Sequence, residues 1–182
     1  TASITPGTVF MANLAEGVRC HFQSFENCLV TVSSSEEAGE GEHKIFDKIR
    51  SAQGLEDKVC VVYGLDADLI MLTLNHLHVT KNMYLFRETP HFIRSIDNTL
   101  DPNELYCLDV PELASSIQME LTGVVDDSSK VRRVHDYIVL CFLLGNDFMP
   151  HFPALNIRTT GVEHVMEAYR TTIGVRKNVF MT

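Results

Sequence analysis

The chain has 182 residues, and its 15 Lys and Arg against 24 Asp and Glu give a formal net charge of −9 with neutral histidines. Its pI is near 5.3, whereas a nucleic-acid-binding surface usually gives a domain a pI above about 9, so the composition argues against a basic surface of that kind here. Hydrophobic residues make up 45% and charged residues 21%, which excludes disordered and fibrous chains and predicts one globular domain or a large part of one.

The sequence also excludes membrane and secretory classes of protein. No apolar run reaches the ~18 residues that a membrane span needs, and the N-terminal region does not read as a signal peptide. The five cysteines are odd in number, widely spaced and mostly set in apolar runs, so we expect reduced core thiols; they are Cys20, Cys28, Cys60, Cys107 and Cys141. We therefore expect an intracellular protein of the cytoplasm or nucleus that is monomeric and does not associate with membranes.

The first fifty residues predict a helix, a strand and a second helix. After a turn at 5–7, apolar side chains recur every four positions and predict an amphipathic helix; they are Phe10, Leu14, Val18 and Phe22. The run 28–32 (CLVTV) predicts a strand, and a polar loop at 33–39 leads into the second helix. The core face of that helix is expected to consist of Ile45, Phe46 and Ile49.

The middle of the chain continues the alternation of strand and helix. Strands are predicted at 59–63 and 83–86, and the almost wholly apolar helical stretch 69–72 between them is expected to be buried. Alternating strands and helices are typical of an α/β fold with a mainly parallel sheet. Residues 90–109 carry turn signals and are predicted to be irregular.

The last third of the chain predicts helices. Asp109 with Glu112 three positions later forms a capping box for one helix, and Thr160 with Glu163 forms one for the last helix. Residues 126–129 cap a helix at 131–144, whose apolar last turns are expected in the core before Gly145 ends it. The apolar stripe of the last helix is Val162, Val165, Met166 and Tyr169.

We predict a single domain, 1–182, that belongs to a larger catalytic region. Residues 1–88 would form its α/β part and residues 89–182 a mainly helical part.

Three acidic clusters stand where an α/β fold places its functional residues. They are Glu40 with Glu42, Asp66 with Asp68, and Asp147. Each is next to apolar sequence, and burying an unpaired carboxylate costs several kcal/mol, so each cluster needs a cation. Lys and Arg are sparse there, and hard divalent ions such as Mg²⁺ and Mn²⁺ prefer oxygen ligands. Five carboxylates fit two ions that share ligands.

The spacing of these clusters sets a condition on the structure. Residues two apart on a regular helix do not share a face, so each pair can converge only where a loop passes into a helix. Gly39, Gly41 and Gly64 give the backbone the freedom for such junctions. A single E-x-E or D-x-D pair is more often a solvated surface feature, but the recurrence of three clusters favours a site.

The motifs resemble those of the Xrn-type 5′→3′ exoribonucleases. The matching strings are 3–8 (SITPGT), 39–45 (GEGEHKI), 63–72 (YGLDADLIML), 87–88 (RE) and 145–151 (GNDFMPH). More distantly, the arrangement is similar to the flap-endonuclease and PIN-like superfamily. The resemblance implies a twisted, mainly parallel sheet flanked by helices.

The resemblance also implies a function. Residue by residue, the metal ligands and catalytic residues would be Glu40, Glu42, Asp66, Asp68 and Asp147, holding two Mg²⁺ or Mn²⁺ ions. The activity would be hydrolysis of single-stranded, 5′-monophosphorylated RNA to mononucleotides in RNA degradation. The segment after Asp147 would lie near the nucleic-acid backbone.

The chain departs from the family pattern in three respects. The family has an earlier segment with two further acidic ligands and a basic pocket for the 5′ phosphate, so we expect this chain to be the second part of the catalytic region, with the N-terminal part of the same protein as its partner. Ala38 replaces the usual proline, and the stretch between Arg87 and Val131 is short for the family. A flap-type DNA nuclease and a non-catalytic RNA-binding protein remain as alternatives.

Several other polar residues have competing interpretations. Lys44 could neutralise a scissile phosphate or simply be solvated, and His43 could bond a ligand carboxylate or cap a helix. A zinc site at His76, His78 and His91 is disfavoured, because no cysteine stands at ligand spacing. An ion pair that supports the site is expected at 87–88, and the basic pairs at 132–133 and 176–177 are expected at the surface.

Overall fold

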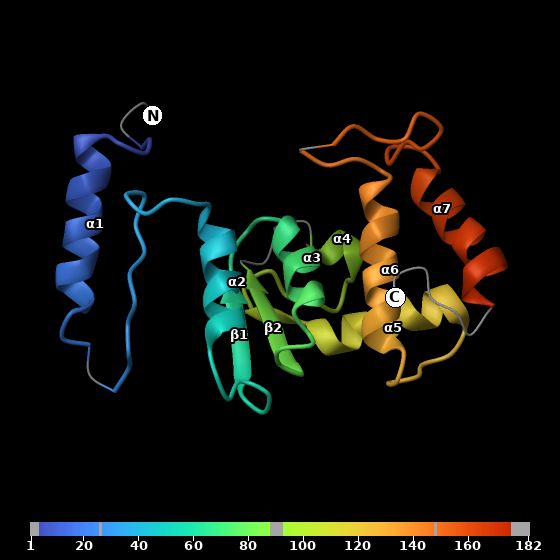
Figure 1. The fold of residues 1–182 in the computed structure, drawn as a ribbon, viewed down its shortest axis with the longest axis horizontal. Coiled ribbons are helices and arrows are strands. Elements are labelled where there is room, and N and C mark those ends of the chain that lie inside the picture. The colour runs from blue at the N-terminus through green and yellow to red at the C-terminus, as the bar shows by residue number, and fades with distance from the viewer. Residues whose placement is uncertain (1–3, 26, 88–92, 148, 176–182) are drawn as a thin grey trace. The chain divides into compact units, whose positions relative to one another are not determined.

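A computed structural model describes residues 4–25, 27–87, 93–147 and 149–175 (Figure 1). The chain forms two compact units, residues 1–51 and residues 52–182, and each is described by itself. The fold class is α/β, as predicted. The predicted domain boundary at residue 88 stays a prediction.

Unit 1 contains two helices, α1 (Val9–Phe22) and α2 (Gly41–Ser51), at the two predicted places. The Thr8 hydroxyl caps α1 by accepting a hydrogen bond from the Met11 amide at 3.4 Å. The only buried residue of α1 is Ala15, so the predicted apolar stripe is not a core face. In α2, Phe46 and Ile49 are buried as predicted.

Two expectations for unit 1 are wrong. Residues 28–34 contain no strand. A strand exists only where a neighbour pairs with its backbone, and apolar residues alone do not supply that neighbour. Ile45, expected on the core face of α2, is exposed.

Unit 2 is built on a three-stranded sheet of β1 (Val59–Tyr63), β2 (Asn82–Arg87) and β3 (Tyr106–Asp109), in the order β1-β2-β3. Strands β1 and β2 run parallel, with Val61 opposite Tyr84. Strands β2 and β3 run antiparallel, with Phe86 opposite Cys107. The sheet is therefore mixed, with one parallel pair. The stretch 90–109, predicted to be irregular, contains the short strand β3 and, before it, the helix α4 (Ile93–Ile96).

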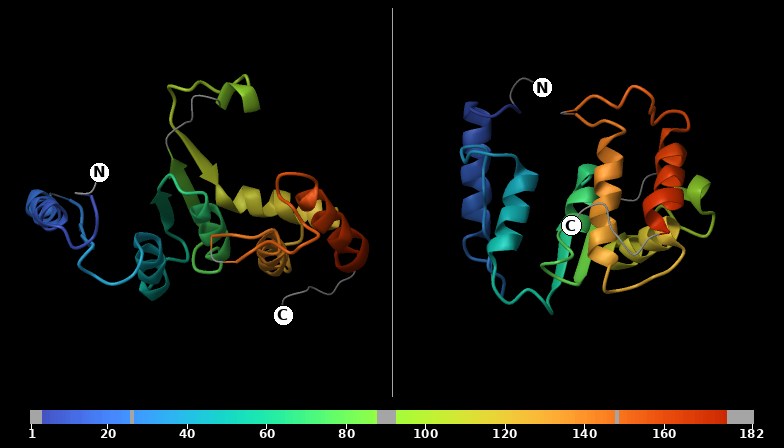
Figure 2. Two further views of the ribbon diagram at one scale, coloured as in Figure 1. Left: turned by 90° about the horizontal axis from the view of Figure 1, so that it is seen from above. Right: turned by 45° about the vertical axis from the view of Figure 1, so that its right-hand side comes forward.

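Helices pack on one another and on the sheet in unit 2. They are α3 (Asp68–Asn75), α5 (Val110–Thr122), α6 (Lys130–Phe142) and α7 (Gly161–Tyr169), followed by a π-helical turn, η1 (Arg170–Gly174). Helices α3 and α5 pack on β2, and α6 packs on both of them (Figure 2). This arrangement buries the core side chains Met83, Leu85, Val110, Leu121 and Val134.

The helix boundaries of unit 2 test the predicted caps. The Asp109 carboxylate accepts from the Glu112 amide at 2.9 Å, as predicted for α5. The Thr160 side chain makes no such bond to α7, so that capping box is wrong although the helix is present. Phe142 and Leu143, at the end of α6, are exposed and not in the core.

The five cysteines are free thiols, as predicted, but none of them is buried. Cys60 and Cys141 are half-buried, and the others are exposed. Within the described residues, no helix has both the length and the apolar character that crossing a membrane requires.

Candidate metal site

The glutamate pair of unit 1 stands where a loop passes into a helix. Glu40 precedes α2, and its carbonyl accepts from the Lys44 amide at 3.1 Å, so it occupies the position before the first helical residue. Glu42 is in the first turn of α2. Gly39 has φ +97°, the left-handed conformation that glycine adopts most easily. The N-terminus of a helix favours negative charge, so this junction suits the two carboxylates.

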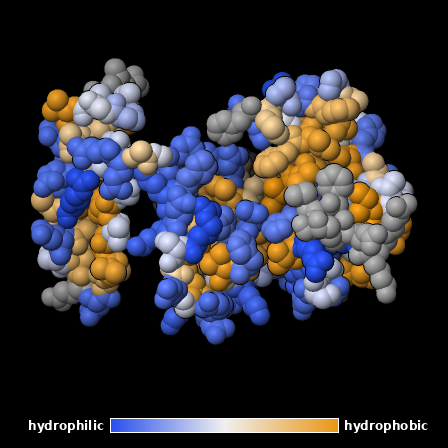
Figure 3. Space-filling model, viewed as in Figure 1, coloured by the Kyte–Doolittle hydropathy of each residue, from blue (hydrophilic) through white to orange (hydrophobic). Residues whose placement is uncertain are grey.

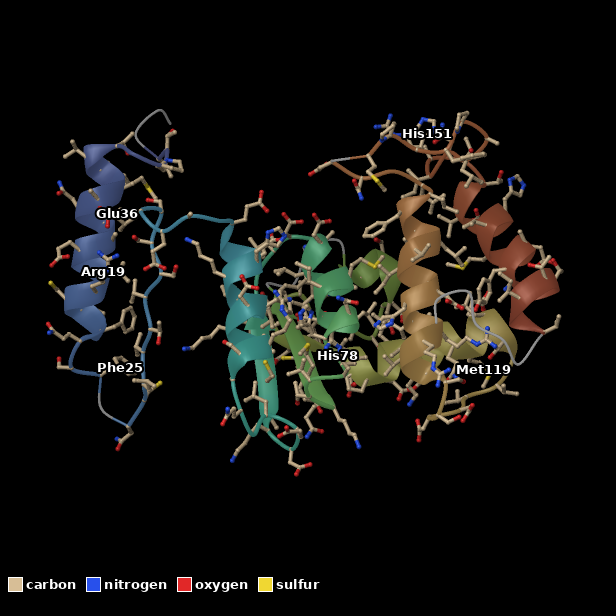
Figure 4. The ribbon with its side chains drawn as sticks, in the orientation of Figure 1. Arg19, Phe25, Glu36, His78, Met119 and His151 are labelled. Carbon is tan, nitrogen blue, oxygen red and sulfur yellow. The ribbon has the colours of Figure 1, made fainter. Side chains whose placement is uncertain are left out.

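Cationic side chains hold the loop that leads to this pair. The Lys44 ammonium donates to the carbonyl oxygens of Ser34 at 3.0 Å and Glu37 at 2.7 Å. Arg19 of α1 donates to the Ser34 hydroxyl at 2.9 Å and pairs with Glu36 at 3.5 Å (Figure 4). Lys44 is therefore a loop anchor in this structure, which neither of its two interpretations from sequence anticipated.

The aspartate pair of unit 2 stands at a second loop-to-helix junction, after β1. An Asp66 carboxylate oxygen, Oδ1, accepts from the Asp68 amide at 3.1 Å just before α3, and Asp68 is the first residue of that helix. Both are exposed. A Cβ on Gly64 would lie 2.3 Å from Cδ1 of Leu69, so a larger residue here would force the Leu69 side chain to move.

Asp147 is exposed on a tight loop between α6 and α7. Within that loop the Asn146 amide donates to the Met149 carbonyl at 2.9 Å, and the Phe152 amide donates to the Leu143 carbonyl at 2.8 Å. The loop begins at Gly145, which has φ +87°. These backbone bonds hold the loop together with a side-chain bond, in which Oδ1 of Asn146 accepts from the Met149 amide at 2.8 Å.

The structure brings the three aspartates to one end of unit 2. Helix α3 packs against α6, and the first turn of α3 and the last turn of α6 lie at the same end, the upper end in Figure 1. Asp66, Asp68 and Asp147 therefore share this end. Among the residues that the structure describes, no group of three or more His, Cys, Asp or Glu side chains is close enough to hold a metal ion.

Glu40 and Glu42 belong to the other unit, so the convergence of all five carboxylates stays a prediction. The chemistry of the donors fits the predicted ions, because every candidate ligand is a carboxylate oxygen, which Mg²⁺ and Mn²⁺ prefer.

The histidines after α3 have structural contacts. Nδ1 of His76 lies 2.6 Å from the Leu72 carbonyl, and Nδ1 of His78 lies 2.9 Å from the Asn75 carbonyl. These contacts hold the end of α3 and use one ring nitrogen of each histidine. His91, Glu88, Arg176 and Lys177 lie outside the described residues.

One buried polar cluster was not predicted from the sequence, and the prediction for one of its members is wrong. Arg133, expected at the surface, is buried on α6 together with Asp136, and both contact Tyr169 of α7. The available signal was an Arg-x-x-Asp spacing, which puts both side chains on one face of a helix whose other buried residues include Val134.

Comparison with protein families places the acidic clusters in two known regions. The family model of the XRN 5′-3′ exonuclease N-terminus matches residues 1–89, and that of the Xrn1 helical domain matches residues 128–181. The chain belongs to the Xrn-type 5′→3′ exoribonuclease family. The first Xrn region contains Glu40, Glu42, Asp66 and Asp68, and the second contains Asp147.

Curated Xrn-type relatives align over most of the chain. The 5′-3′ exoribonuclease 2 homolog of Caenorhabditis elegans is 30% identical over 93% of this chain and 22% of its own length. The 5′-3′ exoribonuclease 2 of Schizosaccharomyces pombe is 32% identical over 93% of this chain and 20% of its own. The 5′-3′ exoribonuclease 1 of Saccharomyces cerevisiae is 31% identical over 94% of this chain and 12% of its own. The chain thus spans about a fifth or less of the length of these relatives.

These Xrn-type relatives are longer than this chain inside the matched region as well. The three alignments run over 210, 201 and 189 positions, more than the 182 residues of the chain. Neither family model covers residues 90–127. This stretch contains β3 and α5 and lies between the two regions that carry the acidic clusters.

Proposed function

We propose that the full-length protein is a metal-dependent exoribonuclease that hydrolyses single-stranded, 5′-monophosphorylated RNA from its 5′ end to mononucleotides. The observation that carries this proposal is the order of the two Xrn-type regions along one chain, each with acidic residues at a loop-to-helix junction or on a tight loop. The fold that we propose for the complete catalytic region is the PIN and flap-endonuclease-like one, with a mainly parallel sheet.

The five carboxylates would hold two Mg²⁺ or Mn²⁺ ions. We assign Asp66, Asp68 and Asp147 to one ion, and Glu40 and Glu42 to the other ion or to a bridge between them. When bound, such ions lower the pKa of a water molecule and stabilise the leaving 3′ oxygen of a phosphodiester.

The chain's own residues prepare these ligands. The Asp68 amide donates to Oδ1 of Asp66, which favours one orientation of the carboxylate that would hold the ion. The backbone of the loop at Asp147 is held by hydrogen bonds, which limits the ordering that ion binding would require of this loop. Fixed ligands bind with less loss of conformational entropy than mobile ones.

The substrate's phosphates need positive charge from elsewhere. The chain carries −9, and two divalent ions contribute only four positive charges. We propose that the rest of the protein, the N-terminal part of the catalytic region above all, supplies the basic pocket for the 5′ phosphate. The protein would act as a monomer in RNA degradation in the cytoplasm or nucleus.

The test is RNA hydrolysis by the full-length protein with Asp68→Asn or Asp66→Asn. At position 66 asparagine keeps a side-chain oxygen that can accept from the Asp68 amide, and at position 68 it keeps the size of the side chain; in both places it removes the charge, so folding is preserved. We expect the rate in Mg²⁺ or Mn²⁺ to fall at least about a hundredfold, since the several kcal/mol that a bound ion contributes are lost. Asp57→Asn, at an exposed position before β1, is the matched control and should retain the wild-type rate.

The two alternatives predict different results in the same assay. A flap-type nuclease would cut a DNA flap faster than RNA. A non-catalytic protein would bind RNA without cleaving it, even in Mn²⁺. Full activity of Asp66→Asn and Asp68→Asn would remove the metal-ligand assignment.

A further inference from the structure

Helices α6 and α7 are joined by a cluster of three buried polar side chains. Arg133, Asp136 and Tyr169 are 4%, 0% and 3% exposed. Nη1 of Arg133 donates to the Tyr169 hydroxyl at 2.6 Å, and that hydroxyl donates to Oδ2 of Asp136. The same Arg133 nitrogen lies 3.9 Å from Oδ2 of Asp136, so the positive and negative charges of the cluster compensate each other.

This cluster fixes the direction of α7. The two helices run antiparallel side by side (Figures 1 and 2). Arg133 and Asp136 are in the first turns of α6, and Tyr169 is the last residue of α7. The cluster therefore joins the two helices at the end opposite the connection between them. Burial, together with the bond to Asp136, raises the pKa of Tyr169 to about 12, so its hydroxyl keeps its proton at neutral pH.

The other end of α7 is bonded to the connection from α6. The Gly161 amide donates to the Asn156 carbonyl at 3.0 Å, and a Cβ on Gly161 would lie 2.6 Å from that oxygen. The Leu155 amide donates to the Phe152 carbonyl at 2.8 Å, and the Phe152 amide donates to the Leu143 carbonyl at 2.8 Å. A tilt of α7 would therefore displace the loop that contains Asp147.

We propose that Arg133, Asp136 and Tyr169 form a positioning element for Asp147. The role given to Asp147 rests on the proposed function, whereas the mechanical link rests on the contacts above. The cluster holds α7 in its orientation on α6. The contact of Gly161 with Asn156 ties the start of α7 to the connection from α6, and the Phe152–Leu143 bond ties that connection to the loop with Asp147. A coupling of this kind needs a contiguous chain of contacts, and each step here is a contact in the structure.

The test is Tyr169→Phe in the full-length protein, which keeps the ring and removes the hydroxyl. We expect amide hydrogen exchange at Asn146, Met149 and Phe152 to accelerate about tenfold, as the loss of a hydrogen bond to a charged group implies. Exchange at Leu85 in β2 should stay unchanged, because a general loss of stability would accelerate both places. The Mn²⁺ concentration for half-maximal RNA cleavage should rise about tenfold at an unchanged KM for RNA.

Two further variants make the result decisive. Tyr137→Phe removes the hydroxyl of a half-buried tyrosine on α6 that bonds to Cys141, outside the cluster, and should leave exchange and Mn²⁺ dependence at wild-type values. Gly161→Ala disturbs the contact between Gly161 and Asn156, and it should accelerate exchange in the Asp147 loop as Tyr169→Phe does. It serves as the test if Tyr169→Phe fails to fold.

Two negative results would have different meanings. Equal exchange and equal Mn²⁺ dependence in Tyr169→Phe and Tyr137→Phe would overturn the positioning role. If the wild-type protein cleaves no RNA, the proposed function fails, while the exchange measurement still decides whether the cluster controls the loop.

Discussion

The two units hold their acidic residues by different means. In unit 2, the loop at Asp147 is held by backbone hydrogen bonds and by the Asn146 side chain, and at Asp66 a carboxylate oxygen accepts from the Asp68 amide; both loops stand on helices that pack into a large core. In unit 1, the loop before Glu40 is held by the side chains of Lys44 and Arg19. Hydrogen bonds between neutral backbone groups, as in the Asp147 loop, depend little on salt, whereas exposed charged contacts are screened by it.

The difference extends to the apolar side chains. Buried apolar residues of unit 1 are Ala15, Phe46 and Ile49 among those described, and the other buried apolar residues lie in unit 2. Large apolar side chains of α1, such as Phe10 and Leu14, are exposed, and apolar residues appear at the surface of this unit in Figure 3. We infer that unit 2 determines the stability of the chain and that the acidic loop of unit 1 opens more easily.

The largest expected effect compares the same truncation in the two units. Leu85 of β2 is 1% exposed, and Leu14 of α1 is 47% exposed. Leu85→Ala should lower the free energy of unfolding by about 3 kcal/mol, because it removes buried methyl groups and leaves a cavity. Leu14→Ala should change it by less than about 0.5 kcal/mol, since alanine is a good helix former and little burial is lost.

Urea denaturation followed by far-UV circular dichroism measures both values, which suits a chain without tryptophan. Similar losses of unfolding free energy in the two variants would show that α1 contributes to the core as much as β2 does. The inferred difference in stability between the units would then be wrong.

The sequence predicted those elements that depend on local pattern. The strands at 59–63 and 83–86 and the helices after Asp109 and Thr160 are present at the predicted places, although only Asp109 makes the predicted cap. The predicted strand at 28–32 is absent, and the four-residue strand β3 was not predicted. Both depend on a pairing partner elsewhere in the chain, which a local pattern does not reveal.

For the candidate site, spacing predicted the type of junction but not the supporting contacts. Asp66 and Asp68 lie at a loop-to-helix junction, as their spacing required. The anchoring by Lys44 could not be read from sequence, because lysine is most often solvated, and for Arg133 the sequence offered only the Arg-x-x-Asp spacing as an indication of burial. Only the three-dimensional structure shows that these two cationic side chains have hydrogen-bond partners.

The second expected effect concerns the glycines of the two acidic loops. A Cβ on Gly145 would lie 2.8 Å from the His151 amide nitrogen, in addition to the strain of φ +87°. Gly145→Ala should therefore destabilise the chain by about 2 kcal/mol or more. At Gly39, with φ +97°, the nearest atom is Cε of Lys44 at 3.9 Å, so Gly39→Ala adds backbone strain of about 1 kcal/mol without a clash.

Gly123→Ala separates strain from clash within unit 2. Gly123 has φ +74°, and nothing lies within 4 Å of the added Cβ. Thermal unfolding should place Gly123→Ala between the wild type and Gly145→Ala. If Gly145→Ala were no worse than Gly123→Ala, the close approach of Gly145 to the His151 backbone would not hold in the protein.

The smallest expected effect is Lys44→Met, which removes the ammonium that binds the Ser34 and Glu37 carbonyls. Methionine keeps the length of the chain, so the change isolates two charge-assisted hydrogen bonds, which are partly exposed and worth about 1 kcal/mol together. Lys48→Met removes the same charge from the last turn of α2 and is the matched control. The Glu37 amide, which donates to the Ser34 carbonyl at 3.2 Å, should exchange about fivefold faster in Lys44→Met and at the wild-type rate in Lys48→Met.

Salt offers a second test of the same contact. Since salt screens exposed charges, 1 M NaCl should raise the exchange rate of the Glu37 amide in the wild type toward that in Lys44→Met and leave exchange at Phe152 in the Asp147 loop unaffected. Equal salt sensitivity at Glu37 and Phe152 would mean that the two acidic loops are held by the same kind of contact.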